Sequence, residues 1–475
     1  MGVKLDWDIE AEKGKHKEHR EDGEQRKSRR LGVFRLLLVV AVFALFLGAI
    51  VYLVFQRVEQ VNQYVEQLLT DTVQAEVAAL RVGDLDAFLA QQKSATGDWE
   101  VTQSQTFEAY QSLKVSSDVV LSGRIISVEI DDQRGRVQVE EIIDGVPYVR
   151  TWNYWRYTAD VRCLTAELDE TVQCDEGWFH VPPDYTFWGD SATIENDNYI
   201  IRYHTVDEQV ARALDASLDN WFVDLCSYFD CATIPFITVD IIPAPQSPVR
   251  WQEGDAGTWQ LIIPSPYTDL ARADIPFDNQ LQIDVAEVFV SRIIDQTTAN
   301  DGFPSSDALY LRNSITAWLV GRFVQLNPET YLLESLIAQY GNDIVVSILR
   351  NLQPTSDISL LATSAGVASV ADLQVDWRDF VLWRLESEDD LIESRNEAGW
   401  IAFYDFTDNT VRDVAYQRYQ NNFIASSRIV SETSITVSST GIPQLIARVN
   451  VTRGFETGEE IIVFNLVNGN WLRAN

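Results

Sequence analysis

The chain has 475 residues and a formal net charge of −34, from 37 basic and 71 acidic residues. A protein this acidic repels polyanions, so the charge excludes nucleic acid as a partner and favours solubility or the binding of cations. At ~100 to 200 residues per domain, the length predicts roughly two to four domains.

An uncharged, mostly apolar run of twenty residues at 36–55 follows a basic segment. At ~1.5 Å per residue a helix of this length reaches ~30 Å, the thickness of the hydrocarbon core of a bilayer. Residues 1–35 hold ten Lys or Arg, whereas only Arg57 lies close behind the run. Because Lys and Arg are retained on the cytoplasmic side, we expect a single-pass cell-membrane protein with residues 56–475 outside.

A cleaved signal peptide is the alternative to this anchor. Its apolar core would be shorter and would end in small residues, whereas this run ends in Val-Tyr-Leu-Val-Phe. We therefore expect an uncleaved membrane helix after a disordered cytoplasmic tail at 1–35.

Beyond the run, apolar residues recur at helical spacing, namely Val58, Val61, Val65, Leu68 and Leu69. The pattern predicts that the membrane helix continues outward as an amphipathic stalk over 56–75. The pattern alone is too short to establish a coiled coil.

Residues 76–190 are predicted to form helices followed by an antiparallel β-meander. Segment 76–92 predicts two helices separated at Gly83-Asp84, and strands are predicted at 124–130, 136–142, 146–157 and 176–180. This order resembles the cone-shaped fold of the nuclear transport factor two and ketosteroid isomerase superfamily. Its members are pocket enzymes or plain binding and dimerisation modules.

Aromatic residues crowd the last hairpin of this segment. Trp152, Tyr154 and Trp178 could stack on a sugar or an aromatic ligand. Packing in the interior of the cone and against the next domain is the favoured alternative, since aromatic side chains dominate protein cores.

The four cysteines all follow the apolar run, at Cys163, Cys174, Cys226 and Cys231. In an oxidising compartment this spacing suggests disulfides between Cys163 and Cys174 and between Cys226 and Cys231. Four buried thiols are the alternative. The spacing matches neither a C-x-x-C redox motif nor a zinc ribbon.

Residues 191–393 are predicted to be mainly helical after an initial strand at 199–204. Further strands are expected at 236–242 and 259–263, and helices at 206–225, 281–296, 307–326, 328–340, 342–352 and 376–386. With the segments 336–341, 348–352, 365–367 and 377–380, this order resembles the peptidase MA-like group of gluzincin metalloproteases.

An active gluzincin needs H-E-x-x-H, because two His at i and i+4 bind zinc from one helical face while the Glu activates water. The corresponding helix has Ala286 and Val290 at the ligand positions and retains only Glu287, and the next helix has Asn313 where the third ligand is expected. The resemblance therefore implies a degenerate peptidase without zinc. Glu287 is a vestigial candidate, better explained as a leftover or an ion-pair partner.

Residues 394–475 repeat the pattern of the first segment. A helix is predicted at 409–423, strands at 445–451 and 460–466, a turn at 468–469, and a final strand at 470–473. The echo of the terminal hairpin suggests a second domain of the nuclear transport factor two type.

We therefore expect an α+β multidomain fold: one N-terminal transmembrane helix, a cone-shaped domain, a mainly helical degenerate peptidase domain and a second cone. The predicted function is that of a bacterial, membrane-anchored, non-catalytic protein without cofactor or metal, which binds a peptide, an envelope polymer or a partner protein. The alternatives are a hydrolase or cone-pocket enzyme that uses carboxylates without zinc, and a structural spacer.

Overall fold

The computed structural model describes residues 25–158, 176–229, 234–252, 259–298, 304–407 and 409–475. The side chains of residues 25–37, 39–42, 44 and 297 are also outside the described set. The fold is mixed α+β with several domains, which confirms the predicted fold class at this level. The chain separates into two compact units, residues 1–73 and 74–475.

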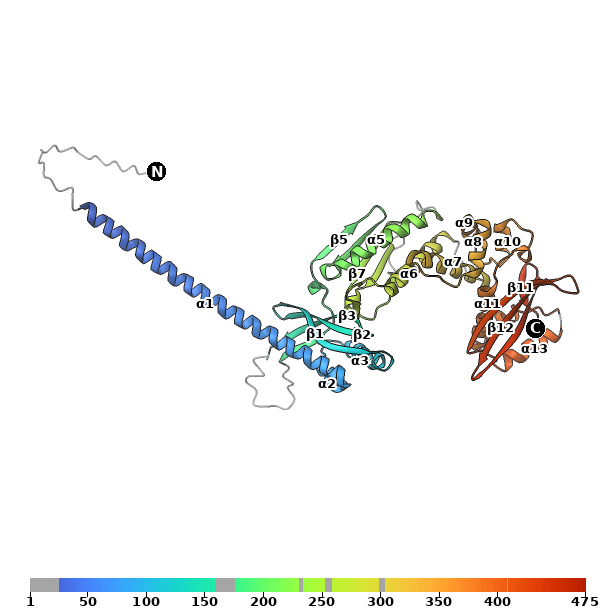
Figure 1. Cartoon of the computed structure of the whole chain (residues 1–475), viewed down its shortest axis with the longest axis horizontal. Coiled ribbons are helices and arrows are strands. Elements are labelled where there is room, and N and C mark those ends of the chain that lie inside the picture. Colours follow the sequence, from blue (N-terminus) through green and yellow to red (C-terminus); the bar gives the residue numbers. More distant parts are fainter. Residues whose placement is uncertain (1–24, 159–175, 230–233, 253–258, 299–303, 408) are drawn as a thin grey trace, which may run out of the picture. The chain divides into compact units, whose positions relative to one another are not determined.

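Helix α1 (Gln25–Val82) is the longest element, at 58 residues, and is drawn as one helix in Figure 1. Gly83 ends it with a φ of +83°, which glycine adopts without steric cost. The side chain of Asp84 then accepts a hydrogen bond from the backbone N–H of Ala87 and caps helix α2 (Leu85–Leu89). The predicted break at Gly83-Asp84 is confirmed.

Among the described residues, no single helix is long and apolar enough to cross a membrane. Two consecutive helices, Tyr331–Tyr340 and Asp343–Asn351, are together long and apolar enough for a membrane span, but they are bent by 117° relative to each other. The uncharged run at 36–55 lies in α1, where many side chains are outside the described set, so its role as a membrane anchor stays a prediction.

The first sheet is an antiparallel meander in which β1, β2 and β3 are joined by tight turns. Its strands are β1 (Val119–Asp131), β2 (Arg134–Ile143), β3 (Val146–Tyr157), β4 (Gly177–Val181) and β10 (Ala271–Arg272). Asp144 and Gly145 both have positive φ, as the hairpin turn between β2 and β3 requires. The predicted meander and its return through β4 are confirmed. Helix α3 (Asp98–Ser116), which precedes the sheet, was not predicted.

The second sheet has the order β5-β6-β7-β9-β8. Its strands are β5 (Ser191–Glu195), β6 (Tyr199–His204), β7 (Ile237–Ile242), β8 (Arg250–Trp251) and β9 (Trp259–Pro264). Strands β6, β7 and β9 are parallel, and helix α5 (Glu208–Leu225) connects β6 to β7. The apolar side chains of one sheet face join α5 and the later helices in one hydrophobic core.

Helices follow this sheet and complete that core. They are α6 (Asn279–Thr297), α7 (Ser306–Val324), α8 (Tyr331–Tyr340), α9 (Asp343–Asn351), α10 (Leu360–Ala365) and α11 (Arg378–Glu393). The five predicted helices of this region are present, and their ends agree within three residues, except that α11 runs seven residues past the predicted end at 386. The short α10 was not predicted.

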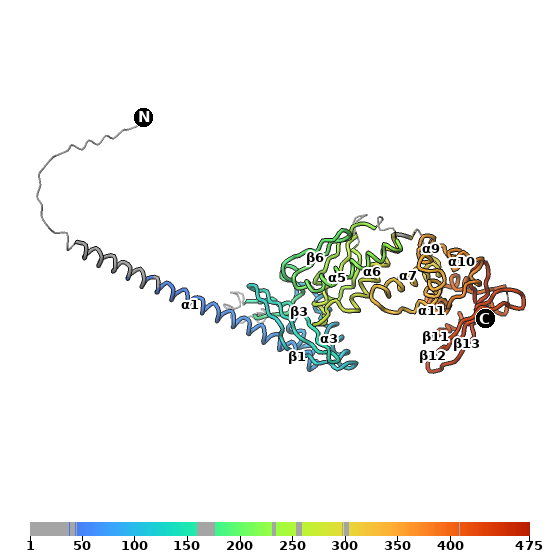
Figure 2. Tube along the Cα trace, turned by 45° about the horizontal axis from the view of Figure 1, so that its top comes forward, coloured from blue at the N-terminus to red at the C-terminus, as the bar shows by residue number. Residues whose placement is uncertain are grey.

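The C-terminal region has helices α12 (Glu397–Ile401) and α13 (Asn409–Gln420) and a third sheet, β11 (Ser427–Val437), β12 (Pro443–Arg453), β13 (Glu456–Val467) and β14 (Asn470–Arg473). The strands pair antiparallel in sequence order and lie beside α11 (Figure 1; Figure 2). Trp471 of β14 contacts Trp377 edge to face at 5.9 Å, so this sheet shares its core with the helical region.

A buried glutamate occurs in corresponding places in the N-terminal and C-terminal regions. Glu76 of α1 accepts a side-chain hydrogen bond from Gln92, 16 residues further on, and Glu388 of α11 accepts one from Tyr404, also 16 residues further on. In both regions that second residue forms an isolated bridge to the last strand, at His180 of β4 or at Arg473 of β14.

The segment between the glutamate and its hydrogen-bond partner is also alike in the two regions. A residue with positive φ, Gly83 or Arg395, is followed by a capping side chain, Asp84 or Asn396, and then by a helix of 5 residues. The offsets from the glutamate are equal in both copies. The two regions therefore share one local design, and in the second copy it begins in α11.

Candidate functional site

Glu76 forms the centre of a buried polar cluster between the end of α1 and the first sheet. Its side chain is 0% exposed. It accepts hydrogen bonds from the Tyr154 hydroxyl at 2.8 Å and from the Gln92 amide at 2.9 Å, and His180 Nδ1 lies 2.8 Å from its Oε1. A buried carboxylate needs such partners, because an unpaired charge in a protein interior is strongly unfavourable.

The imidazole of His180 is enclosed by aromatic rings. The ring centroids of Tyr154, Trp99 and Trp152 lie 5.2, 5.3 and 5.6 Å from that of His180. Tyr154 is its cross-strand partner on β3, whereas Trp99 comes from α3. Burial raises the pKa of Tyr154 well above its usual value, and the Glu76 carboxylate adds to the rise.

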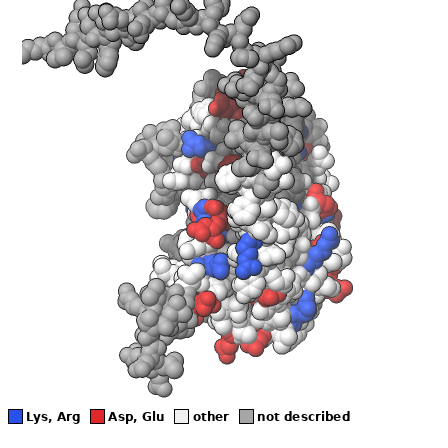
Figure 3. Space-filling view, turned by 90° about the vertical axis from the view of Figure 1, so that its left-hand side faces the viewer, with Lys and Arg blue, Asp and Glu red and all other residues white. Residues whose placement is uncertain are grey.

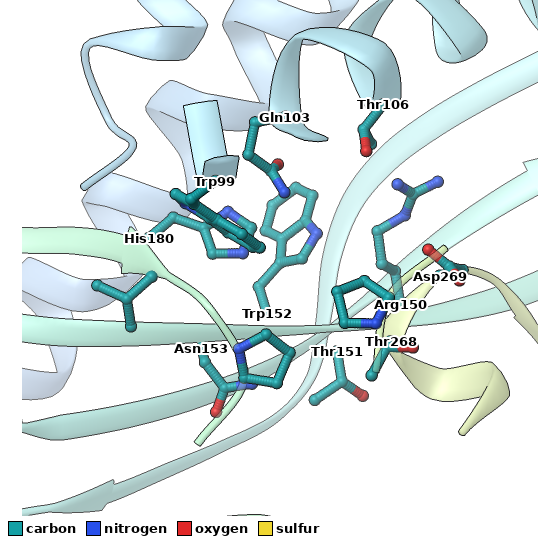
Figure 4. A pocket seen from close by; sticks show the side chains of 13 residues that line it. Trp99, Gln103, Thr106, Arg150, Thr151, Trp152, Asn153, His180, Thr268 and Asp269 are labelled. Atoms are coloured by element: carbon teal, nitrogen blue, oxygen red, sulfur yellow. The ribbon is translucent and has the colours of Figure 1, made fainter. Parts of the chain in front are cut away.

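A small cavity lies beside this cluster, at a notch in the first sheet. Strand β3 pairs with β10 at Val149 and with β4 from Asn153 onward, which leaves residues 150–152 without a strand partner on that edge. Side chains of Trp99, Trp152 and His180 line one end of the notch, and Arg150 and Asp269 lie at the other (Figure 4). The cavity volume is about 20 Å³, room for one water molecule.

Asn153 also lines the cavity and is 3% exposed. Neither its amide nitrogen nor its amide oxygen has a hydrogen-bond partner among the described residues. Buried polar atoms are normally satisfied, so these two atoms indicate an ordered water or a polar ligand group at this place.

The arrangement is one that can move a proton. Because Nδ1 of His180 faces the Glu76 carboxylate, the neutral imidazole has its proton on Nδ1, and Nε2 is the nitrogen that can accept a proton from a ligand. The carboxylate holds the ring in place, as in other carboxylate–histidine pairs. In this structure a substrate larger than water would require Trp99 or Trp152 to move.

The three residues predicted as stacking candidates are all buried. Trp152, Tyr154 and Trp178 are 5%, 1% and 3% exposed. Trp152 lines the cavity, whereas Tyr154 and Trp178 are packed in the interior. Their packing in the interior corresponds to the favoured alternative from the sequence.

The positions that the sequence resemblance aligned with zinc ligands are closed where they lie on α6. Ala286 and Val290 of α6 are 0% exposed and belong to the hydrophobic core, whereas Glu287 and Asn313 are exposed. Trp251 of β8, the edge strand of the second sheet, donates a hydrogen bond to the carbonyl of Val288 at 2.9 Å. In the described part of the chain, no group of three His, Cys, Asp or Glu side chains could hold a metal ion.

The open face of the second sheet carries a groove of about 340 Å³. Thr193, Arg202, Asp240 and Ile262 are neighbours across β5, β6, β7 and β9, so one row of side chains crosses its floor. Arg202 lies 3.9 Å from Asp240, and the amide of Gln260 donates to the same carboxylate. The floor therefore combines one pair of opposite charges with apolar side chains such as that of Ile262.

Cys226, at the end of α5, is disulfide-bonded. Cys163, Cys174 and Cys231 lie outside the described residues, so the pairings of Cys163 with Cys174 and of Cys226 with Cys231 stay predictions.

The Glu76 cluster was not found from the sequence, although one signal was present. Glu76 falls on the face of α1 that otherwise carries Leu69, Val73, Val77 and Leu80, all of them buried. A single carboxylate on an apolar helical face indicates a buried partner. The partner itself, His180, lies 104 residues away in sequence and could not be identified by spacing.

Comparison with known proteins gives no match to a family model, to a curated protein or to a solved structure.

Proposed function

We propose that this chain is a single-pass membrane protein that displays non-catalytic binding domains outside the membrane. In this proposal residues 1–35 are cytoplasmic, residues 36–55 cross the bilayer, and α1 continues as a stalk. A degenerate peptidase-like domain follows a first cone and precedes a second. The ligand is a peptide, an envelope polymer or a partner protein.

The observation that carries the non-catalytic proposal is the burial of Ala286 and Val290. In a gluzincin the side chains at these positions face an open cleft and hold zinc. Here they are part of the hydrophobic core, and Trp251 packs on the same helix through the carbonyl of Val288. Restoring a site would require two histidines in place of core side chains as well as a new opening.

Support for two cones comes from the matching designs around Glu76 and Glu388. Both regions have a helix with a buried glutamate, a short capped helix and an antiparallel meander. In each, the last strand carries a basic residue that contacts the glutamate, His180 in one case and Arg473 in the other.

The groove on the second sheet is large enough for a ligand. Its volume of about 340 Å³ falls within the ordinary range of small-ligand sites, whereas the cavity beside His180 holds one water. Its opposite charges, Arg202 and Asp240, are paired, which favours a neutral ligand segment. On the face shown in Figure 3, basic and acidic side chains are interspersed, so that face offers a polyanion no patch of one sign.

The proposal is tested on the purified full chain in detergent. We expect zinc well below one atom per chain by elemental analysis, and no peptide hydrolysis that Glu287→Gln abolishes. Stoichiometric zinc, or hydrolysis lost in that variant, would overturn the non-catalytic proposal.

Binding is tested by the shift in melting temperature with neutral oligosaccharides, cell-wall fragments and extended peptides. A ligand of the groove should raise the melting temperature of the wild type and of Asp413→Ala, which changes an exposed acid on α13, but not of Asp240→Ala. If no compound shifts the wild type, the chain is better explained as a structural spacer.

A second candidate function, a cone-pocket enzyme, is favoured by the His180 and Glu76 pair beside an unsatisfied Asn153. Such an enzyme would use Nε2 of His180 as a general base on a small polar substrate. The test is turnover of small carbonyl and hydroxy compounds by the wild type and by His180→Gln. Activity that is lost in His180→Gln but kept in Glu287→Gln would support it.

A further inference from the structure

A pocket of about 340 Å³ lies at the connection between α2 and α3. It is lined by Leu89 of α2, by Gln92 and the loop that follows, and by Trp99 at the start of α3. Its volume falls within the ordinary range of small-ligand sites. We call this space the outer pocket, and the cavity of about 20 Å³ beside His180 the inner cavity.

The indole of Trp99 separates the two spaces. Trp99 lines both the outer pocket and the inner cavity, and it is 7% exposed. Its Nε1 is buried and has no hydrogen-bond partner among the described residues. No hydrogen bond of the side chain therefore fixes the indole in this position, and a rotation of the side chain would join the two spaces.

The outer pocket also reaches the His180 cluster through Gln92. The amide nitrogen of this side chain donates to Glu76 at 2.9 Å, whereas its Oε1 is buried without a hydrogen-bond partner in the part of the chain that the structure describes. A ligand in the outer pocket would lie one side chain away from the carboxylate that holds His180.

Gln103 of α3 offers its amide to a ligand in the inner cavity. It lines that cavity, is 5% exposed, and its side chain forms no hydrogen bond with another described residue. In Figure 4 the amide points from α3 toward the indole of Trp152. A buried amide is normally paired, and it both donates and accepts hydrogen bonds. The group that satisfies both of its atoms at once is a second amide.

The rest of the lining favours a neutral ligand with a flat ring. An anion in the inner cavity would be repelled by the carboxylates of Glu76 and Asp269. A cation would lose its water there and would lie near Arg150. A flat ring can pack on the indole of Trp99, as aromatic rings do in protein interiors.

The second region shows that packing alone does not require these side chains. Val411 and Ala415 follow their buried glutamate at the same distances in sequence as Trp99 and Gln103 follow theirs. All four are buried, on the helix that comes after the short capped helix. Because the same local design folds with valine and alanine, the indole and the amide of the first region are available for another role.

We propose that the outer pocket and the inner cavity form one binding site for a small, neutral aromatic carboxamide, with Trp99 as the gate between them. The amide of the ligand pairs with that of Gln103 and donates its remaining N–H to Nε2 of His180, while the ring packs on Trp99. The proposal rests on the cavity of the second candidate function and names its ligand class, and it requires no catalysis by His180.

The test is fluorine NMR of 4-fluorobenzamide with the purified full chain in detergent. Gln103→Ala should bind this probe about tenfold more weakly than the wild type, because two hydrogen bonds are lost. The matched control is Gln105→Ala, which changes an exposed glutamine of the same helix and should bind as the wild type does. No binding by the wild type, or equal binding by Gln103→Ala, would overturn the site.

A second comparison needs no variant. The wild type should bind 4-fluorobenzamide about tenfold more tightly than fluorobenzene, which lacks the amide, and than 4-fluorobenzoate, which carries a charge. Equal affinity for the three compounds would mean that the protein or the detergent holds only the ring, and it would contradict recognition of the amide.

The gate is tested by the rate of binding. Trp99→Val introduces the smaller side chain of the second region and should raise the association rate of 4-fluorobenzamide several-fold. An unchanged rate would contradict the gate. Binding of the amide without turnover of any compound would refute the cone-pocket enzyme and keep the site, so the two failures are distinguishable.

Discussion

The N-terminal and C-terminal regions each bury one glutamate, but they satisfy its carboxylate with different side chains. In the first region, the carboxylate of Glu76 is hydrogen-bonded to His180, Tyr154 and Gln92. In the second, the carboxylate of Glu388 is hydrogen-bonded to Arg473 and Tyr404. Arginine stays charged at any ordinary pH, so the second cluster is a permanent ion pair. In the first cluster the basic residue is an imidazole instead, and it lies beside a cavity.

A shared arrangement of helices and strands therefore holds different side chains at the corresponding point. The Arg473 cluster joins the last strand to α11, and Oε1 of Glu388 has no hydrogen-bond partner among the described residues. The His180 cluster leaves the unsatisfied amide of Asn153 next to a space for water. If either region has chemistry or a small ligand, it is the first.

The largest expected loss of stability comes from a substitution that breaks the C-terminal cluster. Arg473→Met removes the cation from Glu388, which is 4% exposed, and leaves a buried carboxylate without its charge partner. We expect a loss of about 3 to 5 kcal/mol in the free energy of unfolding. Urea unfolding followed by tryptophan fluorescence measures it.

The matched control is Arg212→Met, which removes an exposed ion pair with Glu208. Its urea midpoint should stay at the wild-type value, because exposed pairs contribute little. Equal midpoints for Arg473→Met and the wild type would mean that the buried pair does not stabilise the fold.

The next effect concerns a buried carboxylate that has neutral donors only. Asp207 accepts hydrogen bonds from Trp188 and Ser265, and burial raises its pKa to about 6. The folded state therefore binds a proton more readily than the unfolded state, whose Asp has a pKa of about 4. The free energy of unfolding should fall by about 2 to 3 kcal/mol from this group as pH rises from about 4 to about 6.

Asp207→Asn should remove that contribution. Unfolding measured at several pH values should give a flatter profile for the variant than for the wild type over this window. A steeper profile, or a difference confined to pH above about 7, would show that another group is responsible.

The smallest expected loss of stability comes from removing the hydroxyl of Tyr154 or of Tyr404. Tyr154→Phe removes one of the donors to Glu76, which has no permanent cation, and should cost about 1.5 to 3 kcal/mol. Tyr404→Phe leaves Glu388 with Arg473 and should cost less, about 1 kcal/mol. The reverse order would mean that His180 compensates Glu76 as well as an arginine would.

Much of the fold could be predicted from local patterns. The turn at Asp144-Gly145 and the alternation along β12 mark strands, and the cap after Gly83 marks a helix boundary. Strand β5 and strand β11 were missed because their exposed edges carry mixed polar residues. Helix α3 was missed because its buried side chains, Trp99, Gln103, Phe107 and Tyr110, include a polar residue in the helical stripe.

The candidate sites could not be predicted to the same degree. The absence of an H-E-x-x-H motif at 286–290 can be read from the sequence, because the motif concerns five consecutive residues. The contact between Glu76 and His180 cannot be read from the sequence, because the two residues are 104 positions apart and meet only when β4 pairs with β3.

By itself, the sequence determined the alternation of elements, the absence of an H-E-x-x-H motif and the uncharged run at 36–55, because these depend on near neighbours along the chain. Only the tertiary structure decided that Ala286 and Val290 are closed off, that Glu76 is buried with His180, and that α11 repeats the end of α1. The physical reason is burial: whether a side chain loses its water depends on segments that are distant in sequence and adjacent only in the fold.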